Sequence, residues 1–404
     1  MDMSVDRSVD RPMEEKVVGL LDEDELVCLT QRLVRIATPN PPADYSVIAP
    51  EMKRLMEEAG LEVRIMEGAP GKPNVVGLWR GIDPGGPTLL LDAHMDVVPA
   101  GNGWDGDPWA ASVRDGAIWG RGAADMKHSL AIMICVVRAL KRAGFVPRGS
   151  LLLSATNDDE TAGQFGLKYV IEQGLQKAGW PMPDFHFLLE ASRWAVNVAF
   201  KGRVWVKVTV EGKPAHGGTP EKGINAILKM VELFRRLMAM ERHTHPLMPA
   251  DTLNIGTIRG GERPNVVPDT CTATFDYRFV GPCSAEQAVK RFRRVIEMLE
   301  GEDPEFKVSE FTVFESRDPV EADPNSPPIR LLMEVIRDLT GREPKLAGTL
   351  SAGNAYWSLK KGLTATMTGP GDMSIAHTVK EHIPIKDLVE GAKIVAAYAV
   401  RYVG

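Results

Sequence analysis

The sequence has few cysteines, and those it has are far apart. The 404 residues contain four, Cys28, Cys135, Cys271 and Cys283, with no CxxC pair among them. This spacing favours neither a zinc ribbon nor a disulfide framework. We therefore expect reduced thiols and a cytoplasmic protein.

Basic charge and long apolar runs are also scarce. The formal net charge of −6 provides no basic footprint for a phosphate backbone, so we expect no nucleic-acid partner. The longest apolar runs, such as "LAIMICVV", fall far short of the roughly 20 residues that cross a bilayer. The polar start "MDMSVDRSVDRPMEEK" is unlike a secretory signal. We expect no membrane association.

The remaining composition is that of an ordinary globular protein. Hydrophobic residues make up 44% and charged residues 25%, which gives no support to disordered or fibrous classes. A chain of 404 residues is too long for one ordinary core. Two domains, or one domain with an insertion, are expected.

Hydrophobic periodicity in the first half alternates between helix and strand. We expect helices at 22–36, 46–60 and 126–143, and apolar strands at 61–67, 74–80, 88–94, 150–156 and 185–190. Such alternation predicts an α/β fold, with a mostly parallel or mixed central sheet flanked by helices. Functional residues are then expected at strand ends.

The pattern changes after residue 202. Strand, helix, strand and helix patterns follow one another in "RVWVKVTVEG", 224–240, "CTATFDYRFV" and "QAVKRFRRVIEMLEG". This block predicts a small α+β insert. The α/β pattern returns near residue 319, so the expected organisation is a catalytic domain at 1–202 and 319–404 with an inserted domain at 203–318.

The motif "LLLDAHMDVVP" places His94 and Asp96 at the end of an apolar strand. Residues two apart on a strand point to the same face. Histidine is a common metal ligand, and a carboxylate often orients its second ring nitrogen, a role that suits Asp96. An isolated pair of this kind more often caps a strand end.

Three carboxylates follow other element ends. Asp125 stands at the start of the expected helix 126–143, Glu160 follows the strand "SLLLSAT", and Glu190 ends "FHFLLE". Together with His94 they would converge on one edge of the sheet, where unpaired carboxylates are costly. A divalent metal ion, bound by His and carboxylate groups, removes that cost.

A second histidine ligand is expected late in the chain. His377 in "GPGDMSIAHTVKEHIPI" follows a glycine-proline turn in the returning α/β segment, where it could reach the same edge. His382 and His128 remain alternatives on the sequence alone.

Five ordered motifs extend over nearly the whole chain: "LLLDAHMDVVPAG", "WDGDPWAASVRDGAIWGRGAADMK", "DDETAGQFG", "KPAHGGTPEKGINAI" and "AHTVKEHIPI". In order and spacing they resemble the dinuclear metallohydrolase family of carboxypeptidase G, acetylornithine deacetylase, succinyl-diaminopimelate desuccinylase and aminoacylase. The resemblance implies a catalytic α/β domain with an inserted α+β lid and dimerisation domain.

The resemblance also implies roles for single residues. Asp125 would bridge two metal ions, with His94 and Glu190 on one ion and Glu160 and His377 on the other. Asp96 would orient His94, and Asp159 stands at the position of the general base. Ligands of this kind, without Cys, suit one or two ions of zinc, manganese or cobalt.

In the insert, the resemblance implies substrate-binding residues. His216 of "KPAHGG" would stabilise the oxyanion, often across the interface of a homodimer formed through the insert. Asn265 and Arg278 would hold the carboxylate of a small substrate, with Arg263 and Arg259 as neighbouring alternatives.

One departure from the family pattern concerns the base. Asp159 stands where the family usually has Glu, so its carboxylate would stand back by roughly 1.5 Å. A base must come within about 2.6 to 3.2 Å of the proton it takes. Asn354, Trp194, Tyr356 and Trp357 also suggest a rebuilt pocket, although aromatic residues of this kind more often belong to a core.

Three functions follow from these residues. The leading hypothesis is a hydrolase that cleaves a C–N bond of a small carboxylate-bearing substrate with metal-activated water, as an amidohydrolase, deacylase or peptidase. The alternative is a hydrolytic deaminase of an activated aromatic amine, similar to an aminobenzoate, which releases ammonia. The third is a non-catalytic scaffold or binding protein.

Overall fold

The computed structural model describes residues 10–161, 163–350 and 353–404. The chain divides into two compact units. Unit 1 comprises Met1–Val198, Ala322–Ala347 and Gly353–Gly404, and unit 2 comprises Ala199–Glu321 and Gly348–Ala352. Each unit is described by itself.

The central sheet of unit 1 is mixed. Its strands are β1 (Glu62–Glu67), β2 (Pro73–Trp79), β6 (Ser150–Thr156), β3 (Thr88–His94), β7 (Phe185–Leu188), β15 (Thr364–Met367) and β8 (Val196–Phe200), in that order. At the boundary with unit 2, β13 (Val320–Glu321) and β14 (Leu346–Thr349) continue this sheet beside β8. The four neighbours β6, β3, β7 and β15 are parallel, and β1 and β2 are antiparallel. The expected α/β class is confirmed.

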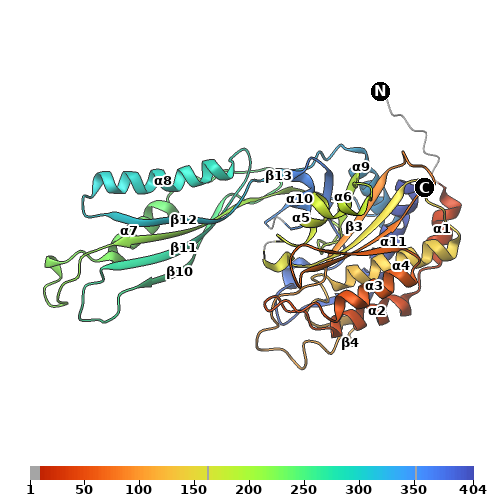
Figure 1. The fold of residues 1–404 in the computed structure, drawn as a ribbon, viewed down its shortest axis with the longest axis horizontal. Helices are drawn as coiled ribbons and strands as arrows, with labels where there is room; N and C mark the ends of the chain where they lie inside the picture. Colours follow the sequence, from red (N-terminus) through yellow and green to blue (C-terminus); the bar gives the residue numbers. More distant parts are fainter. Residues whose placement is uncertain (1–9, 162, 351–352) are drawn as a thin grey trace. The chain divides into compact units, whose positions relative to one another are not determined.

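Helices cover both faces of this sheet (Figure 1). They are α1 (Arg11–Gly19), α2 (Glu23–Arg35), α3 (Ile48–Glu58), α4 (Lys127–Ala143), α5 (Leu167–Tyr169), α6 (Leu175–Ala178), α9 (Pro327–Thr340), α10 (Ala355–Lys360) and α11 (Ile385–Val403). On one face α4 and α11 contact β3, and α2 packs against α4. On the other face, residues of α5, α6 and the π-helix Val170–Gly174 between them form a core with Leu90 and Leu152.

Helix α4 is buried on almost every side, which explains its apolar sequence. Ile132, Cys135 and Val136 have no exposed surface, because the helix lies between the sheet and the outer helices. Its first turn is buried as well, which draws the loop before it into the protein. No helix in the described part of the chain has the length and hydrophobicity to span a membrane.

A second, three-stranded sheet joins segments far apart in sequence. It has the order β16 (His382–Pro384), β5 (Ala117–Trp119), β4 (Ser112–Arg114), with His382 opposite Trp119. The small sheet therefore brings the loop before α4 next to the loop before α11.

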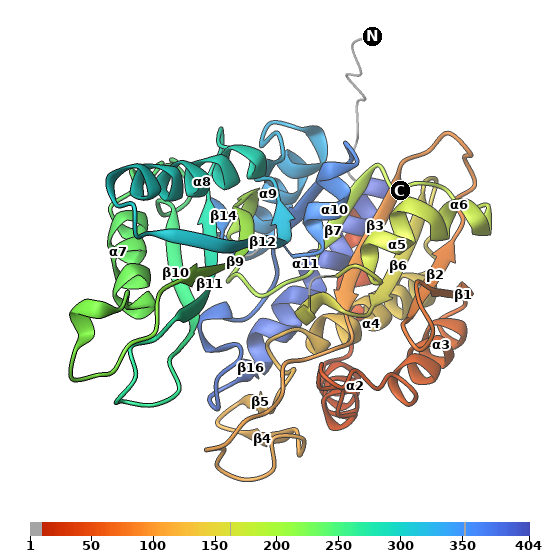
Figure 2. The ribbon, with the colours of Figure 1, turned by 60° about the vertical axis from the view of Figure 1, so that its left-hand side comes forward.

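Unit 2 is a four-stranded antiparallel sheet with two helices on one face (Figure 2). Its elements are β9 (Gly202–Glu211), α7 (Ala226–Met238), β10 (Thr252–Gly260), β11 (Thr270–Phe279), α8 (Ala285–Glu302) and β12 (Lys307–Arg317). Alternate residues of β9 and β11 are buried under α7 and α8, as their apolar-polar alternation predicts. The edge strands β10 and β12 are additions to the expected pattern.

The chain leaves and re-enters unit 1 at neighbouring residues. The backbone N–H of Ala322 donates to the carbonyl of Val198 at 2.8 Å. The Ala199–Glu321 part of unit 2 is thus inserted between two residues of unit 1 that are hydrogen-bonded to each other.

A buried carboxylate stabilises unit 2. Asp251 accepts hydrogen bonds from the Tyr277 hydroxyl at 2.7 Å, the Val280 N–H at 3.0 Å and the His243 N–H at 3.2 Å. Burial opposes the charge of Asp251, but these hydrogen bonds outweigh it and hold its pKa below the ordinary value.

Replacement of Asp251 by asparagine is therefore expected to destabilise unit 2 by about 2 kcal/mol. Because the folded pKa is depressed, the wild-type advantage is present above the unfolded pKa of about 3.9 and is lost as pH falls through the folded pKa. Calorimetric unfolding of both proteins between pH 3 and pH 7 measures this. An equal difference at both ends of the range would contradict it, and E297Q, on the exposed face of α8, serves as control.

Candidate metal centre

Three candidate ligands lie at the ends of neighbouring parallel strands. His94 is the last residue of β3 and pairs in register with Thr156, the last residue of β6. Glu160 follows β6 in the short 3-10 helix Asp159–Thr161, and Glu190 lies two residues after β7. Because β3, β6 and β7 are parallel, their ends meet at one edge of the sheet.

The other two candidates come from loops. Asp125 is buried just before α4, which begins at Lys127. His377 follows the 3-10 helix Met373–Ile375, after β15, and its side chain is half exposed. Its φ of 62° lies in the left-handed region, which non-glycine residues seldom occupy and which recurs at functional sites.

The five side chains converge on the two oxygens of Asp125. His94 Nε2 lies 3.0 Å from Asp125 Oδ1 and 3.6 Å from Glu190 Oε2. On the other side, His377 Nε2 lies 2.9 Å from Asp125 Oδ2 and 3.4 Å from Glu160 Oε2. Each oxygen of Asp125 thus faces one histidine, and each histidine faces one glutamate.

These spacings suit metal ligands. Two donor atoms at 2.0 to 2.2 Å from a tetrahedral ion are about 3.4 Å apart, close to the separations found here. The ligand atoms of His94, Asp125 and Glu160 all lie within 4.8 Å of one another. Glu160 Oε1 is buried without a hydrogen-bond partner among the described residues, so it has a free lone pair for a cation. The residues therefore fit a divalent ion.

Charge at this edge of the sheet is strongly perturbed. Burial raises the pKa of Glu190 to about 8 and of Glu160 to about 7, and the nearby Asp125 adds to both shifts. Hydrogen bonds to Asp125 and Glu160 raise the pKa of His377 to about 10. A cluster of carboxylates that resist ionisation beside basic histidines is a feature of functional sites.

Asp96 supports this cluster through its backbone and its side chain. His94 Nδ1 lies 2.9 Å from the main-chain carbonyl of Asp96 and 3.6 Å from its carboxylate, so the carbonyl is the closer partner of the ring. The buried carboxylate instead accepts the N–H groups of Asp159 at 3.3 Å and Glu160 at 3.2 Å. The Asn40 amide donates to it at 2.8 Å.

The Asp159 carboxyl lies partly buried beside the candidate ligands. Burial raises its pKa to about 6, opposed by His94 and reinforced by Asp96 and Asp125. Asp158, the residue before it, has a φ of 65° and accepts a hydrogen bond from the Thr161 hydroxyl at 2.5 Å. Asp158 thus shapes the turn on which Asp159 is carried.

The two alternative histidines have other surroundings. His128 is fully buried in the first turn of α4, and burial lowers its pKa to about 4. His382 stacks on Trp119 with ring centroids 4.2 Å apart. Of the three histidines, His377 is the one that faces Asp125 and Glu160.

The three candidate substrate residues all lie in unit 2, at two ends of its sheet. His216 pairs with Val266 in an isolated bridge, and the Gly217 N–H donates to the Asn265 carbonyl at 2.8 Å. Arg278 lies near the far end of β11, roughly 26 Å along the strand from its first residue. There its guanidinium contacts Asp276 and the Leu350 carbonyl.

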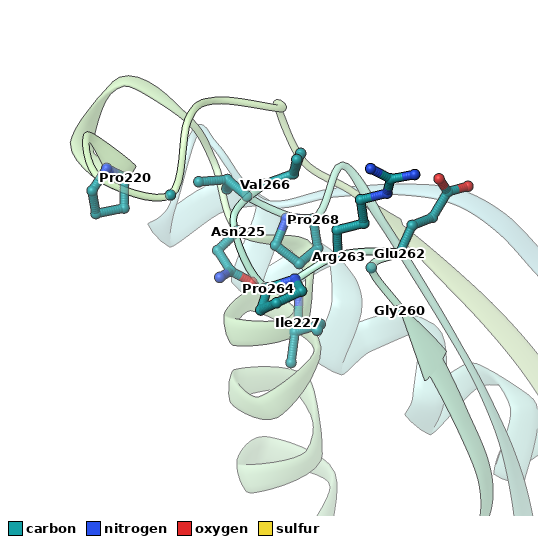
Figure 3. A pocket seen from close by; sticks show the side chains of 12 residues that line it. Pro220, Asn225, Ile227, Gly260, Glu262, Arg263, Pro264, Val266 and Pro268 are labelled. Carbon is teal, nitrogen blue, oxygen red and sulfur yellow. Dashed lines mark hydrogen bonds between the residues drawn. The ribbon is translucent and has the colours of Figure 1, made fainter.

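A pocket of about 450 Å³ adjoins the Asn265 loop (Figure 3). Pro264 and Val266 line it together with Asn225 and Ile227 at the start of α7. Both neighbours of Asn265 thus contribute to one concave surface of unit 2.

Residues expected to rebuild the pocket are mostly structural. Trp194, Tyr356 and Trp357 are buried, with exposed fractions of 4%, 1% and 7%. Asn354 is also buried, and its amide donates to Asp92 at 3.1 Å and to the Thr156 hydroxyl at 2.9 Å. Asn354, which precedes α10, is therefore hydrogen-bonded to strands β3 and β6 below the candidate ligands.

Several buried polar residues around the site were missed from the sequence. Lys127 is fully buried, and burial lowers its pKa to about 7. Asn40 contacts Asp96, and Glu381 contacts the loop that carries Asp125. The sequence gives little indication of these roles, because each residue contacts partners that are distant in sequence. For Lys127 alone, the polar run "DMKHS" at the start of an apolar helix could have indicated a buried polar residue.

Comparison with known proteins gives a family match over most of the chain. A family model described as Peptidase family M20/M25/M40 matches residues 90–401. An N-formyl-4-amino-5-aminomethyl-2-methylpyrimidine deformylase of Halalkalibacterium halodurans is 27% identical, over 93% of this chain and 94% of the relative. An acetylornithine deacetylase of Myxococcus xanthus is 28% identical, over 88% of each chain.

Solved structures share the fold. A tripeptidase from Staphylococcus aureus has a TM-score of 0.80 at 24% identity, covering 95% of this chain and all of that one (100%). An M20 family metallo-carboxypeptidase from Sulfolobus solfataricus has a TM-score of 0.77 at 18% identity, covering 94% of this chain and 99% of that one. With most of its length matched, the chain belongs to peptidase family M20/M25/M40, a family of metal-dependent hydrolases that act on amide and other C–N bonds.

Proposed function

We propose that the protein hydrolyses the C–N bond of a small, carboxylate-bearing amide with the help of one or two divalent ions. The observation that carries this proposal is the pairing at Asp125, where each oxygen faces its own histidine and glutamate. Zinc, manganese or cobalt would suit these ligands.

The proposed ligands form two sets that share Asp125. His94 and Glu190 would complete one set, and His377 and Glu160 the other. When bound, such ions polarise a carbonyl and make water acidic enough to attack at neutral pH. Asp96 holds both sets in register, since it supports His94 through its carbonyl and Glu160 through its carboxylate.

Asp159 is the proposed general base. Its partly buried carboxyl has a pKa of about 6, within the range in which a base accepts a proton and later returns it. It would take the proton of the attacking water and pass it to the leaving amine. Its side chain is one methylene shorter than the glutamate usual in the family, so the amide must be placed closer to β6 or be easier to cleave.

Unit 2 would supply the substrate contacts. His216 would donate to the oxyanion, and Asn265 and Arg278 would hold the substrate carboxylate. His216 and Asn265 lie together while Arg278 lies at the other end of the sheet. The unit 2 of a single chain can bring all three residues to one substrate only with difficulty. This favours a homodimer in which one subunit supplies His216 and Asn265 and the other supplies Arg278. A cytoplasmic location stays a prediction.

The aromatic deaminase remains a second candidate because Asp159 replaces the usual glutamate. To distinguish the amide hydrolase from the deaminase, the purified protein is assayed with N-formyl, N-acetyl and N-succinyl amino acids. It is assayed separately with aminobenzoates that carry electron-withdrawing groups. We expect amine release from an acyl compound and no ammonia from the aminobenzoates. Ammonia release from the aminobenzoates alone would overturn the amide hydrolase.

Metal analysis tests the proposal against a non-catalytic scaffold. Protein purified without chelator is expected to contain at least one zinc, manganese or cobalt ion for each chain. H377A should lose part of that metal, and H382A, whose ring stacks on Trp119, should keep it. A wild-type protein that takes up none of the three ions would contradict the proposal.

A further inference from the structure

Glu381 is a buried carboxylate outside the proposed ligand set. It has no exposed surface and lies four residues after His377. Its Oε1 accepts the backbone N–H groups of Gly122 at 2.8 Å, Ala124 at 3.2 Å and Asp125 at 3.2 Å. Three N–H groups of the turn before α4 thus share one acceptor.

The second oxygen of Glu381 is bound as well. Arg121, which is 2% exposed, donates from Nη1 to Oε2. The Glu381 carbonyl also accepts the Gly120 N–H at 3.2 Å. Both ends of the loop that leads to Asp125 are therefore fixed to one residue.

Besides Glu381, the loop has hydrogen bonds from the Ala123 N–H to the Gly120 carbonyl at 3.1 Å and from the Arg121 N–H to the Pro108 carbonyl at 2.9 Å. Gly122 has a φ of 89°, a conformation that glycine adopts at an entropic cost when it is fixed. Buried N–H groups must find acceptors, and here a side chain from 256 residues further along the chain provides one for Asp125. The position of the Asp125 backbone consequently depends on the segment that carries His377.

We propose that Glu381 is a positioning residue that holds Asp125 and His377 in register and so sets the affinity of the metal centre. The proposal rests on the proposed function, since it takes Asp125 and His377 as ligands. Metal sites require their ligands to be held within about 0.5 Å, and loss of an outer contact typically weakens binding 10- to 100-fold.

The chain offers a matched control for this proposal. Glu14 is also a buried carboxylate of unit 1, and Arg401 binds both of its oxygens at 2.7 and 2.9 Å. The pair joins α1 to α11 and touches no proposed ligand. E14Q therefore removes a buried Glu–Arg pair without changing the Asp125 loop.

The experiment compares wild type, E381Q and E14Q in the full-length protein. After removal of bound metal, zinc is titrated in competition with a chromophoric chelator, and cobalt-substituted samples are examined by absorption spectroscopy. We expect E381Q to bind zinc 10- to 100-fold more weakly and to show a changed cobalt spectrum. E14Q should match wild type in both measurements, even if its thermal stability falls.

Each outcome bears on a definite claim. Zinc affinity of E381Q within twofold of wild type would overturn the positioning role, as would an equal loss in E14Q. If E381Q does not fold, E381D, which keeps the charge on a shorter side chain, is expected to bind zinc several-fold more weakly, and wild-type affinity would again overturn the role. If the wild-type protein itself binds no ion, the proposed function fails instead.

Discussion

Asp159→Asn is expected to lower kcat for amide hydrolysis by about 10²- to 10⁴-fold while the metal content stays that of the wild type. Asparagine has nearly the shape of aspartate, so the turn Asp159–Thr161 and its N–H bond to Asp96 should remain. The variant can no longer take a proton from water. Steady-state kinetics with the best acyl substrate and metal analysis by mass spectrometry measure the two quantities.

Asp158→Asn is the control for this prediction. Asp158 precedes the proposed base, and its carboxylate is occupied by Thr161 and by Lys72, whose Nζ lies 3.6 Å away. A loss in D158N as large as that in D159N would mean that the turn, and not the proton acceptor, is what matters. Full activity in D159N would remove Asp159 from the mechanism.

Asp159→Glu separates the two candidate chemistries. If the protein is an ordinary amide hydrolase, restoring the usual glutamate should retain or raise amide turnover, since the carboxylate reaches roughly 1.5 Å further. Abolished amide turnover in D159E would count against that function.

Asp125→Ala is expected to remove most bound metal and to lower kcat by about 10³-fold or more. Both Asp125 oxygens face histidines of the two proposed ligand sets, so one substitution removes a ligand from each. Divalent ions supply several kcal/mol of transition-state stabilisation, and about 4 kcal/mol corresponds to 10³-fold in rate. Metal content and kcat are measured on the same preparation.

The control for Asp125→Ala is a carboxylate at the other end of the same sheet. Asp184 precedes β7 and accepts the Thr88 N–H at 2.7 Å. D184A should keep its metal and its kcat. A D125A protein that retains wild-type metal content and activity would contradict the bridging role.

The candidate site was predictable in large part because its residues sit at element ends. His94 ends an apolar strand, Glu160 and Glu190 follow two others, and parallel strands bring such residues to one edge. Asp125 precedes a helix whose apolar sequence was evident. The residue pattern by itself did not separate His377 from His128 and His382, because the position of His377 depends on a loop; the family resemblance singled it out.

Other features depend on contacts that no local pattern reveals. Strands β5 and β16 have three residues each and pair across more than 250 positions of sequence, so neither alternates long enough to be recognised. Helix α1 has nine residues, and only Val17 and Glu14 are buried, the latter through Arg401. Strand β10 is exposed at most positions, which removes the apolar alternation that marks a half-buried strand.

The hydrogen bond between Val198 and Ala322 has a consequence for how this protein can change. The Ala322 nitrogen and the Val198 carbonyl oxygen lie 2.8 Å apart, so the chain segment between them closes on itself. The entropic cost of such a closure grows only slowly with the length of the segment. Segments of other lengths could therefore replace the present one between Val198 and Ala322. The expected loss in the stability of unit 1, whose strands lead to His94 and Glu190, is modest. If unit 2 contacts the substrate as proposed, substrate preference could change through unit 2 while the proposed metal ligands of unit 1 stay the same.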